Sequence, residues 1–138
     1  MITSLYAALL GFMFIYLSAL VIKGRAQAQV ALGIGSSRSL EQRVRAHANF
    51  SEYVPFFIML LYMLENQGIH VFIIHLFGCV FLVGRAFHAY SLVCKEKYDG
   101  DKIITSLKYR KIGMFCTFGM LFLVSLLNLW LFIQNPFD

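Results

Sequence analysis

The chain has 138 residues, of which 59% are hydrophobic and 14% are charged, and its mean hydropathy is +0.71. Soluble domains usually contain about half apolar and about a quarter charged residues, so this composition excludes an ordinary soluble domain and indicates a membrane protein. The net charge of +5 does not indicate a nucleic-acid partner, because the charges are segregated into loops beside apolar segments.

Four apolar segments are long enough to cross a bilayer as helices, which takes about 20 residues each. They cover residues 2–22, 40–64, 69–94 and 112–133. The sequence therefore predicts one all-α membrane domain over residues 1–138, a bundle of four transmembrane helices. Its two long loops are residues 23–39 and 95–111.

The second segment contains a helix start signal and a proline. The stretch Ser39-Leu-Glu-Gln42 has the Ser-x-x-Gln form of a capping box, which predicts a helix beginning near Leu40. Pro55 lacks a backbone N–H and predicts a kink within this helix.

The loops predict the topology of the bundle. Of the twelve Lys and Arg residues, eleven lie within 23–45 and 95–111, so the positive-inside rule places both long loops in the cytoplasm and both termini on the other side. The short stretch 65–68 makes the second and third helices an antiparallel hairpin, and Asp99-Gly100 predicts a turn. Trp130 and Asn135-Pro136 fit the outer membrane interface.

A row of polar side chains interrupts the second apolar segment. Arg45, Asn49 and Glu52 are spaced i, i+4, i+7, which places them on one helical face, and Tyr53 flanks that face. A carboxylate at this depth costs at least several kcal/mol in lipid, so Glu52 is expected to face protein, water or a counter-charge.

The third segment carries Arg85 and His88 at a matching depth. At ~1.5 Å per residue, Arg85 lies about 15 Å and Glu52 about 13 Å from the cytoplasmic ends of their helices, which predicts an ion pair between them. The whole set could be a polar cluster that holds the helices together. Its opening toward a basic cytoplasmic mouth favours a site for a small anionic ligand. No metal site is expected, because Cys79, Cys94 and Cys116 lack ligand spacing and are interpreted as small buried hydrophobic residues.

The segment Arg45-Ala-His-Ala-Asn49-Phe-Ser-Glu52-Tyr53-Val-Pro55 resembles the second-helix signature of the MAPEG family, the membrane-associated proteins of eicosanoid and glutathione metabolism. That signature reads approximately R-A-x-x-N-x-x-E-[YT]. The resemblance extends over the whole chain and includes Gly84-Arg85-Ala-Phe-His88 of the third helix. The form is most similar to the short bacterial members, which implies a multi-pass protein of the bacterial inner membrane.

The resemblance implies a homotrimer with glutathione sites between neighbouring subunits near the cytoplasmic face. The residues that it implies for glutathione binding are Arg25, Arg45, Asn49, Glu52, Tyr53, Arg85 and His88. It also implies a thiol-activating cation at the start of the fourth helix, either Arg110 or Lys111. Arginines suit the carboxylates of glutathione, Glu52 its ammonium, and a nearby cation would lower the pKa of its thiol.

Three functions fit these residues. The first is a glutathione-dependent transferase or peroxidase acting on an apolar electrophile or lipid delivered through the bilayer. The second is a non-catalytic member of the same architecture that binds lipid or a partner protein. The third is a small transporter or proton-relay protein using Glu52, Arg85 and His88, which no inverted repeat supports.

Overall fold

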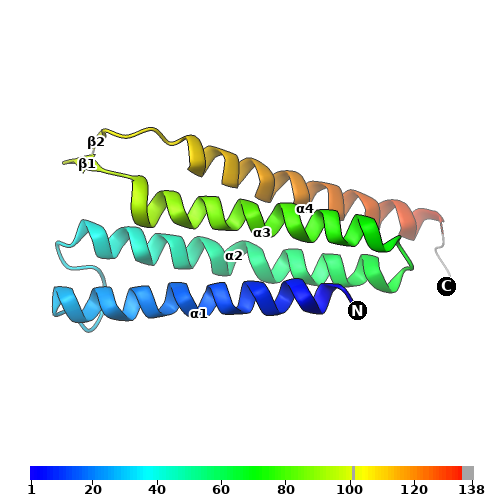
Figure 1. Cartoon of the computed structure of the whole chain (residues 1–138), viewed down its shortest axis with the longest axis horizontal. Coiled ribbons are helices and arrows are strands. Elements are labelled where there is room, and N and C mark those ends of the chain that lie inside the picture. The colour runs from blue at the N-terminus through cyan, green and yellow to red at the C-terminus, as the bar shows by residue number, and fades with distance from the viewer. Residues whose placement is uncertain (101, 135–138) are drawn as a thin grey trace.

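The computed structural model describes residues 1–100 and 102–134, in which four long helices lie side by side (Figure 1). These helices are α1 (Thr3–Ala28), α2 (Arg38–Asn66), α3 (Val71–Tyr90) and α4 (Lys108–Gln134). A π-helical turn, η1 (Ser91–Lys95), and two strands, β1 (Tyr98–Asp99) and β2 (Lys102–Ile103), connect α3 to α4. The predicted all-α four-helix architecture is confirmed.

The two short strands form a small hairpin at one end of the bundle (Figure 1). They pair antiparallel, with Tyr98 opposite Ile103 and Asp99 opposite Lys102. Gly100 has φ +55°, a left-handed conformation that glycine adopts readily, so the predicted turn at Asp99-Gly100 is present.

Helices α2 and α3 form the centre of the bundle, because each contacts the other three long helices, whereas α1 and α4 make no contact with each other within the described residues. Apolar side chains of the inner faces form the core. Its most closely packed ring pair is Phe57 of α2 and Phe81 of α3, which stack in parallel with centroids 3.7 Å apart.

Within the described residues, three helical segments are long and apolar enough to cross a membrane: α1, α3 with η1, and α4. Helix α2 is 29 residues long and lies among them, but its first half carries Arg43, Arg45 and Glu52. Arg45 and Glu52 belong to the polar row of the candidate site.

The first loop is shorter than predicted. Helix α1 continues six residues past the expected end to Ala28, where Gln29 (φ 52°) terminates it. Residues 23–28 contain no proline, and Gly24 lets Leu40 pack closely: a Cβ at Gly24 would lie 3.0 Å from Leu40 Cδ1. Helix α1 therefore reaches the start of α2.

Ser37, and not the predicted Ser39, caps α2. Its Oγ accepts a hydrogen bond from Leu40 N (3.3 Å), so the helix begins at Arg38. The earlier start places Leu40 in the first turn, where its side chain is buried. At Pro55 the helix continues without interruption.

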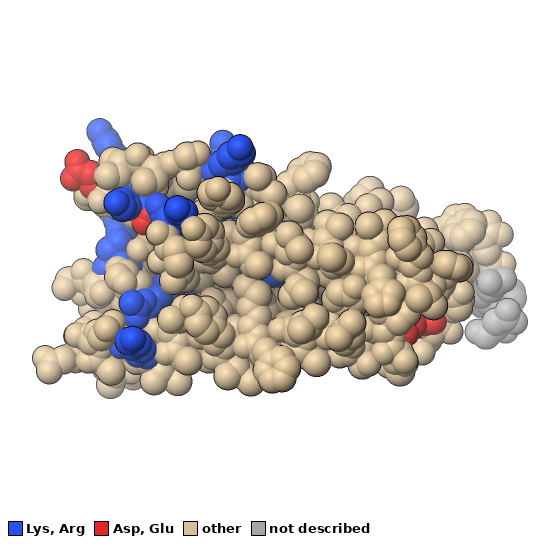
Figure 2. Space-filling view, in the orientation of Figure 1, with Lys and Arg blue, Asp and Glu red and all other residues tan. Residues whose placement is uncertain are grey.

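Lys and Arg side chains gather at the end of the molecule where β1 and β2 lie (Figure 2). The N-terminal end of α1 and the C-terminal end of α4 lie at the opposite end of the bundle from the strands (Figure 1). This segregation agrees with the predicted topology, in which both long loops share one side of the membrane.

The three cysteines and Trp130 lie wholly or partly on the surface of the bundle. Cys79 and Cys94 are exposed and Cys116 is partly buried, so the expectation that all three are buried is wrong; a surface that faces lipid tolerates an apolar thiol. Trp130 is half exposed near the end of α4, as an interfacial residue would be. The predicted Asn135-Pro136 interface lies outside the described residues.

Candidate functional site

Arg85 joins three helices in the middle of the bundle. Its side chain is fully buried, and its Nη2 donates a hydrogen bond to Asn49 Oδ1 of α2 (2.9 Å). Its Nη1 donates to Thr117 Oγ1 of α4 (3.3 Å), and Thr117 in turn donates to Gly113 O (2.8 Å). A buried guanidinium is stable only when such partners replace water, so Asn49 and Thr117 position Arg85.

Two aromatic rings of α2 complete the surroundings of Arg85. The guanidinium carbon lies 5.6 Å from the ring centroid of Phe50 and 5.9 Å from that of Tyr53. Such distances allow cation–π attraction. Tyr53 also packs edge-on against Phe118 of α4, with ring centroids 5.3 Å apart, so it shares the Arg85 environment as well as the polar face of α2.

The predicted ion pair between Glu52 and Arg85 is wrong for the single chain. Glu52 is exposed and has no hydrogen-bond or ion-pair partner among the described residues. The predicted depths of Glu52 and Arg85 agree, but Glu52 lies three residues after Asn49, which rotates its side chain by about 60° around the helix axis relative to that of Asn49. Asn49 is the residue whose side chain binds Arg85. Glu52 therefore points outward.

His88 is buried between α3 and α4. A Cβ at Gly113 would lie only 2.8 Å from His88 Cβ, and His88 Nδ1 has no hydrogen-bond partner within the described chain. The side chain lies one turn from Arg85 and does not line the polar cleft described next. The structure thus associates His88 with the α3–α4 contact.

A polar cleft of about 180 Å³ opens at the loop end of the bundle, between α2, η1, β1 and α4. It is lined by Arg38, Glu41, Gln42, Arg45, Leu92, Tyr98 and Arg110. Arg45 has no hydrogen-bond or ion-pair partner among the described residues. Of the two candidate thiol-activating cations, Arg110 lines the cleft, whereas Lys111 is exposed and does not.

Arg25 belongs to a different cavity. It lines a space of about 290 Å³ between α1 and α2, together with His47 and Ser18, whose side chains are hydrogen-bonded (3.0 Å). The Nε of Arg25 is buried without a hydrogen-bond partner. In a single chain, Arg25 is therefore separate from the polar cleft.

Sequence reasoning missed Glu96 and Tyr98. The Glu96 side chain is fully buried and forms an ion pair with Arg110 (Oε2 to Nη1, 3.3 Å), and it accepts a hydrogen bond from Tyr98 Oη (2.7 Å). Burial and this hydrogen bond raise the pKa of the Tyr98 phenol. The Lys95-Glu96-Lys97 stretch is typical of a solvated loop, and only the folded chain reveals the burial of its carboxylate.

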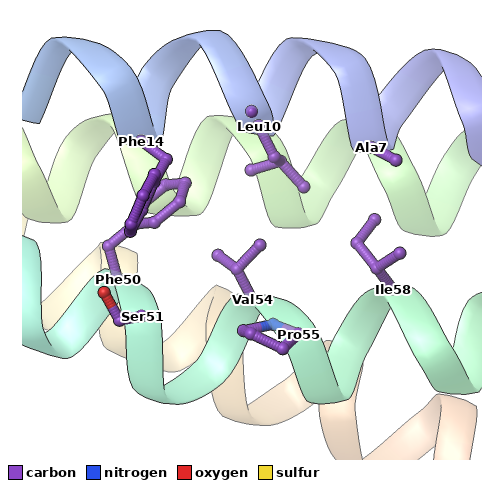
Figure 3. A pocket seen from close by; sticks show the side chains of 9 residues that line it. Ala7, Leu10, Phe14, Phe50, Ser51, Val54, Pro55 and Ile58 are labelled. Atoms are coloured by element: carbon purple, nitrogen blue, oxygen red, sulfur yellow. The ribbon is translucent and has the colours of Figure 1, made fainter.

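An apolar groove of about 450 Å³ separates α1 from α2 toward the middle of the bundle (Figure 3). Leu10 and Phe14 of α1 face Phe50, Val54 and Ile58 of α2 across it. Ser51 is the one hydroxyl residue of its lining, and its Oγ donates to His47 O (2.9 Å). The groove has the chemistry of an acyl-chain or apolar-ligand site.

Comparisons with known proteins agree with this architecture. The MAPEG family profile matches residues 3–130. The inner membrane protein YecN of Escherichia coli K12 is 32% identical over 130 residues, which cover 94% of this chain and 92% of YecN. YecN of Escherichia coli O6:H1 gives the same values. With its four helices, this chain is a multi-pass membrane protein, and it belongs to the MAPEG family.

Proposed function

We propose that the protein is a glutathione-dependent transferase or peroxidase that acts on apolar electrophiles reaching it through the bilayer. The observation that carries the proposal is the polar cleft at the loop end of the α2 polar row, which is lined by Arg110 and by Arg45, a cation without a polar partner in the described part of the chain. Asn49 and Arg85 continue this polar row into the bundle. Cations with free N–H donors in a partly enclosed cleft suit an anionic peptide.

Three kinds of group in glutathione have a candidate partner: a carboxylate, an amide and the ammonium. Arg45 would bind a carboxylate of glutathione with the planar fork of its guanidinium. Asn49 accepts a hydrogen bond from Arg85 with its Oδ1, so its side-chain NH2 group would donate to an amide oxygen of glutathione. The exposed Glu52 would receive the ammonium. Since Glu52 and Arg25 lie away from the cleft of their own chain, we propose that a homotrimer assembles complete sites between subunits.

The chemistry requires a thiolate. Arg110 would lower the thiol pKa of bound glutathione from its usual value of about 8.5. The thiolate sulfur then forms a bond to the electrophilic carbon, and the leaving group departs with its electron pair. In the peroxidase reaction, a hydroperoxide is reduced to an alcohol and water while two glutathione molecules become one disulfide. Orientation and pKa lowering are the main contributions asked of the protein.

Glutathione binding by calorimetry tests the first part of the proposal. Arg45→Ala should weaken binding by about 10- to 150-fold, because it removes a charge-assisted contact of roughly 1.5–3 kcal/mol. Lys23→Ala is the matched control, since Lys23 is an exposed cation at the same end of the bundle and does not line the cleft. Equal affinity of wild type and Arg45→Ala would contradict the proposed site.

Thiolate absorbance during a pH titration of the glutathione complex tests the second part. Arg110→Ala should move thiolate formation to higher pH, while Lys111→Ala should leave it unchanged. The reverse result would assign activation to Lys111. The absence of a thiolate signal in the wild type would contradict the proposed enzymatic function.

A non-catalytic lipid-binding protein is the second candidate, and the groove between α1 and α2 favours it (Figure 3). Val54→Trp should fill this groove and displace a lipid that native mass spectrometry detects on the wild type. Lipid binding without a thiolate signal would favour this function over catalysis.

A further inference from the structure

The π-helical turn η1 places Glu96 beneath the polar cleft. Glu96 N donates to Ser91 O (3.0 Å), and Ser91 Oγ donates to Glu96 Oε1 (3.1 Å). Both side chains are buried. The wider turn ends α3 and directs the Glu96 carboxylate into the protein, although the residue lies in a lysine-rich loop.

Contacts from four parts of the chain converge on Glu96. Besides Ser91, Tyr98 Oη donates to Oε2 (2.7 Å) and Arg110 Nη1 lies 3.3 Å from the same oxygen. The backbone oxygen of Glu96 accepts a hydrogen bond from Gln42 Nε2 of α2 (2.8 Å). One residue therefore joins α2, η1, β1 and α4 around the cleft.

The surroundings of Arg110 are unfavourable for a cation without Glu96. Arg110 lies in the first turn of α4, where the helix dipole presents its positive end. Arg38 and Arg45 line the same small cleft, and like charges at such separations repel. Arg38 is bound to Glu41 (2.7 Å), so Glu96 is the carboxylate paired with Arg110.

We propose that Glu96 is the positioning residue of the polar cleft: its buried carboxylate holds the Arg110 guanidinium against the cleft and offsets the repulsion among the three arginines. Arg110 uses only Nη1 in this contact among the described residues, and 37% of its side chain is exposed. Its remaining N–H donors are therefore held in place for an anion without being consumed by Glu96.

Arginine-selective labelling of the full-length protein with phenylglyoxal tests this restraint without glutathione. Peptide mass spectrometry would follow the labelling rate of Arg110. Glu96→Gln should raise this rate severalfold, because the guanidinium loses its anionic partner and moves toward water. Asp99→Asn, which removes an exposed carboxylate at the same end of the bundle but outside the cleft lining, should leave the Arg110 rate at the wild-type value.

Equal Arg110 labelling rates in wild type and Glu96→Gln would overturn the proposal. If Glu96→Gln does not fold, Tyr98→Phe gives the same test, because it removes one hydrogen bond to the carboxylate and changes no charge. Tyr98→Phe should also raise the rate, and an unchanged rate would overturn the proposal. Glu96→Asp should restore part of the restraint, since it keeps the charge.

The consequence for catalysis rests on the proposed function and has its own measurement. In Glu96→Gln, the thiol pKa of bound glutathione should rise toward the usual value of about 8.5, because Arg110 no longer stays beside the sulfur. A lower or unchanged thiol pKa in Glu96→Gln would show that Glu96 only weakens the positive charge of Arg110. That result would overturn the proposal that Glu96 positions Arg110. If wild type binds no glutathione, the proposed function fails, while the labelling rates still decide the role of Glu96.

Discussion

At the scale of single residues, the buried guanidinium of Arg85 organises the polar part of the bundle. Its partners come from two other helices: Asn49 Oδ1 at 2.9 Å on α2 and Thr117 Oγ1 at 3.3 Å on α4. The carboxylate that sequence reasoning assigned to Arg85 points outward instead. These neutral oxygens bind Nη1 and Nη2, whereas Nε is buried without a hydrogen-bond partner within the described chain. Neutral oxygens do not cancel the charge, so Arg85 remains a source of positive potential beneath the candidate site.

The hydroxyl of Thr117 is expected to stabilise this arrangement. Thr117→Val should lower the free energy of unfolding by about 1–3 kcal/mol, because Arg85 loses an acceptor in a buried position. Thr117→Ser keeps the hydroxyl and should retain most of the stability. Thermal unfolding in detergent compares the two variants, and equal losses would show that packing of the Thr117 methyl group dominates.

The effect of replacing Glu52 with leucine distinguishes two environments of its side chain, a glutathione site between subunits and lipid. If Glu52 faces a glutathione site between subunits, Glu52→Leu should abolish the contact with the ammonium and weaken glutathione binding severalfold. If Glu52 faces lipid, the same substitution should instead raise the stability in membranes, because it removes a costly intramembrane charge. Glu52→Gln, which retains shape and polarity, separates the loss of charge from the gain of an apolar side chain.

At the scale of elements, two glycines bring α3 and α4 into backbone contact. A Cβ at Gly113 would lie 2.6 Å from Gly84 O and 2.7 Å from His88 N, so no side chain fits there without a shift. Small residues at helix interfaces commonly allow close approach in membranes. This contact aligns the Arg110 end of α4 with η1, and therefore with Glu96.

Gly113→Ala should separate α3 from α4 and lower stability by about 1–3 kcal/mol, since overpacking displaces the backbone. Gly119→Ala is the matched control on the same helix, because no atom lies within 4 Å of a Cβ there. The control should be neutral or slightly stabilising, as alanine is the better helix former by up to about 1 kcal/mol. Unfolding temperatures of the two variants check the prediction.

The number, order and apolar character of the helices could be predicted from the sequence, because lipid imposes a simple length and composition rule. The rotation of a side chain about its helix could not. Asn49 and Glu52 share a broad face, but only packing determines which one meets Arg85. The sequence predicted Ser39 as the cap of α2, but Ser37 caps it, and the packing of Leu40 against Gly24 accompanies this earlier start. Glu96 gave no local signal, since its partners are distributed over four elements.

At the scale of the whole molecule, charge and hydrophobicity are separated along the bundle axis. Apart from Arg85, Lys and Arg lie at the end with the long loops and the polar cleft (Figure 2), whereas the groove between α1 and α2 is lined by apolar side chains (Figure 3). A water-soluble anion and a membrane-dissolved ligand could thus approach from different phases. This division fits a reaction between glutathione and an apolar compound.

The predicted topology can be measured in intact cells with a membrane-impermeant maleimide. In a background with Cys79, Cys94 and Cys116 replaced, Asn66→Cys should be labelled from outside the membrane. Ser36→Cys, in the first long loop, should be labelled only after permeabilisation. The opposite pattern would invert the orientation and place the polar cleft outside the cytoplasm.

At the end opposite the cleft, Glu65 at the end of α2 accepts hydrogen bonds from Ile2 N and Thr3 N (2.8 Å for Thr3), the first backbone donors of α1. A helix start normally finds such an acceptor close by in sequence, but here it is supplied from more than sixty residues later. During biosynthesis, α1 therefore lacks this acceptor until α2 has crossed the membrane and carried Glu65 to the far side. The first two helices become a completed insertion unit only together, and a truncation between them would leave the N-terminal helix without its cap.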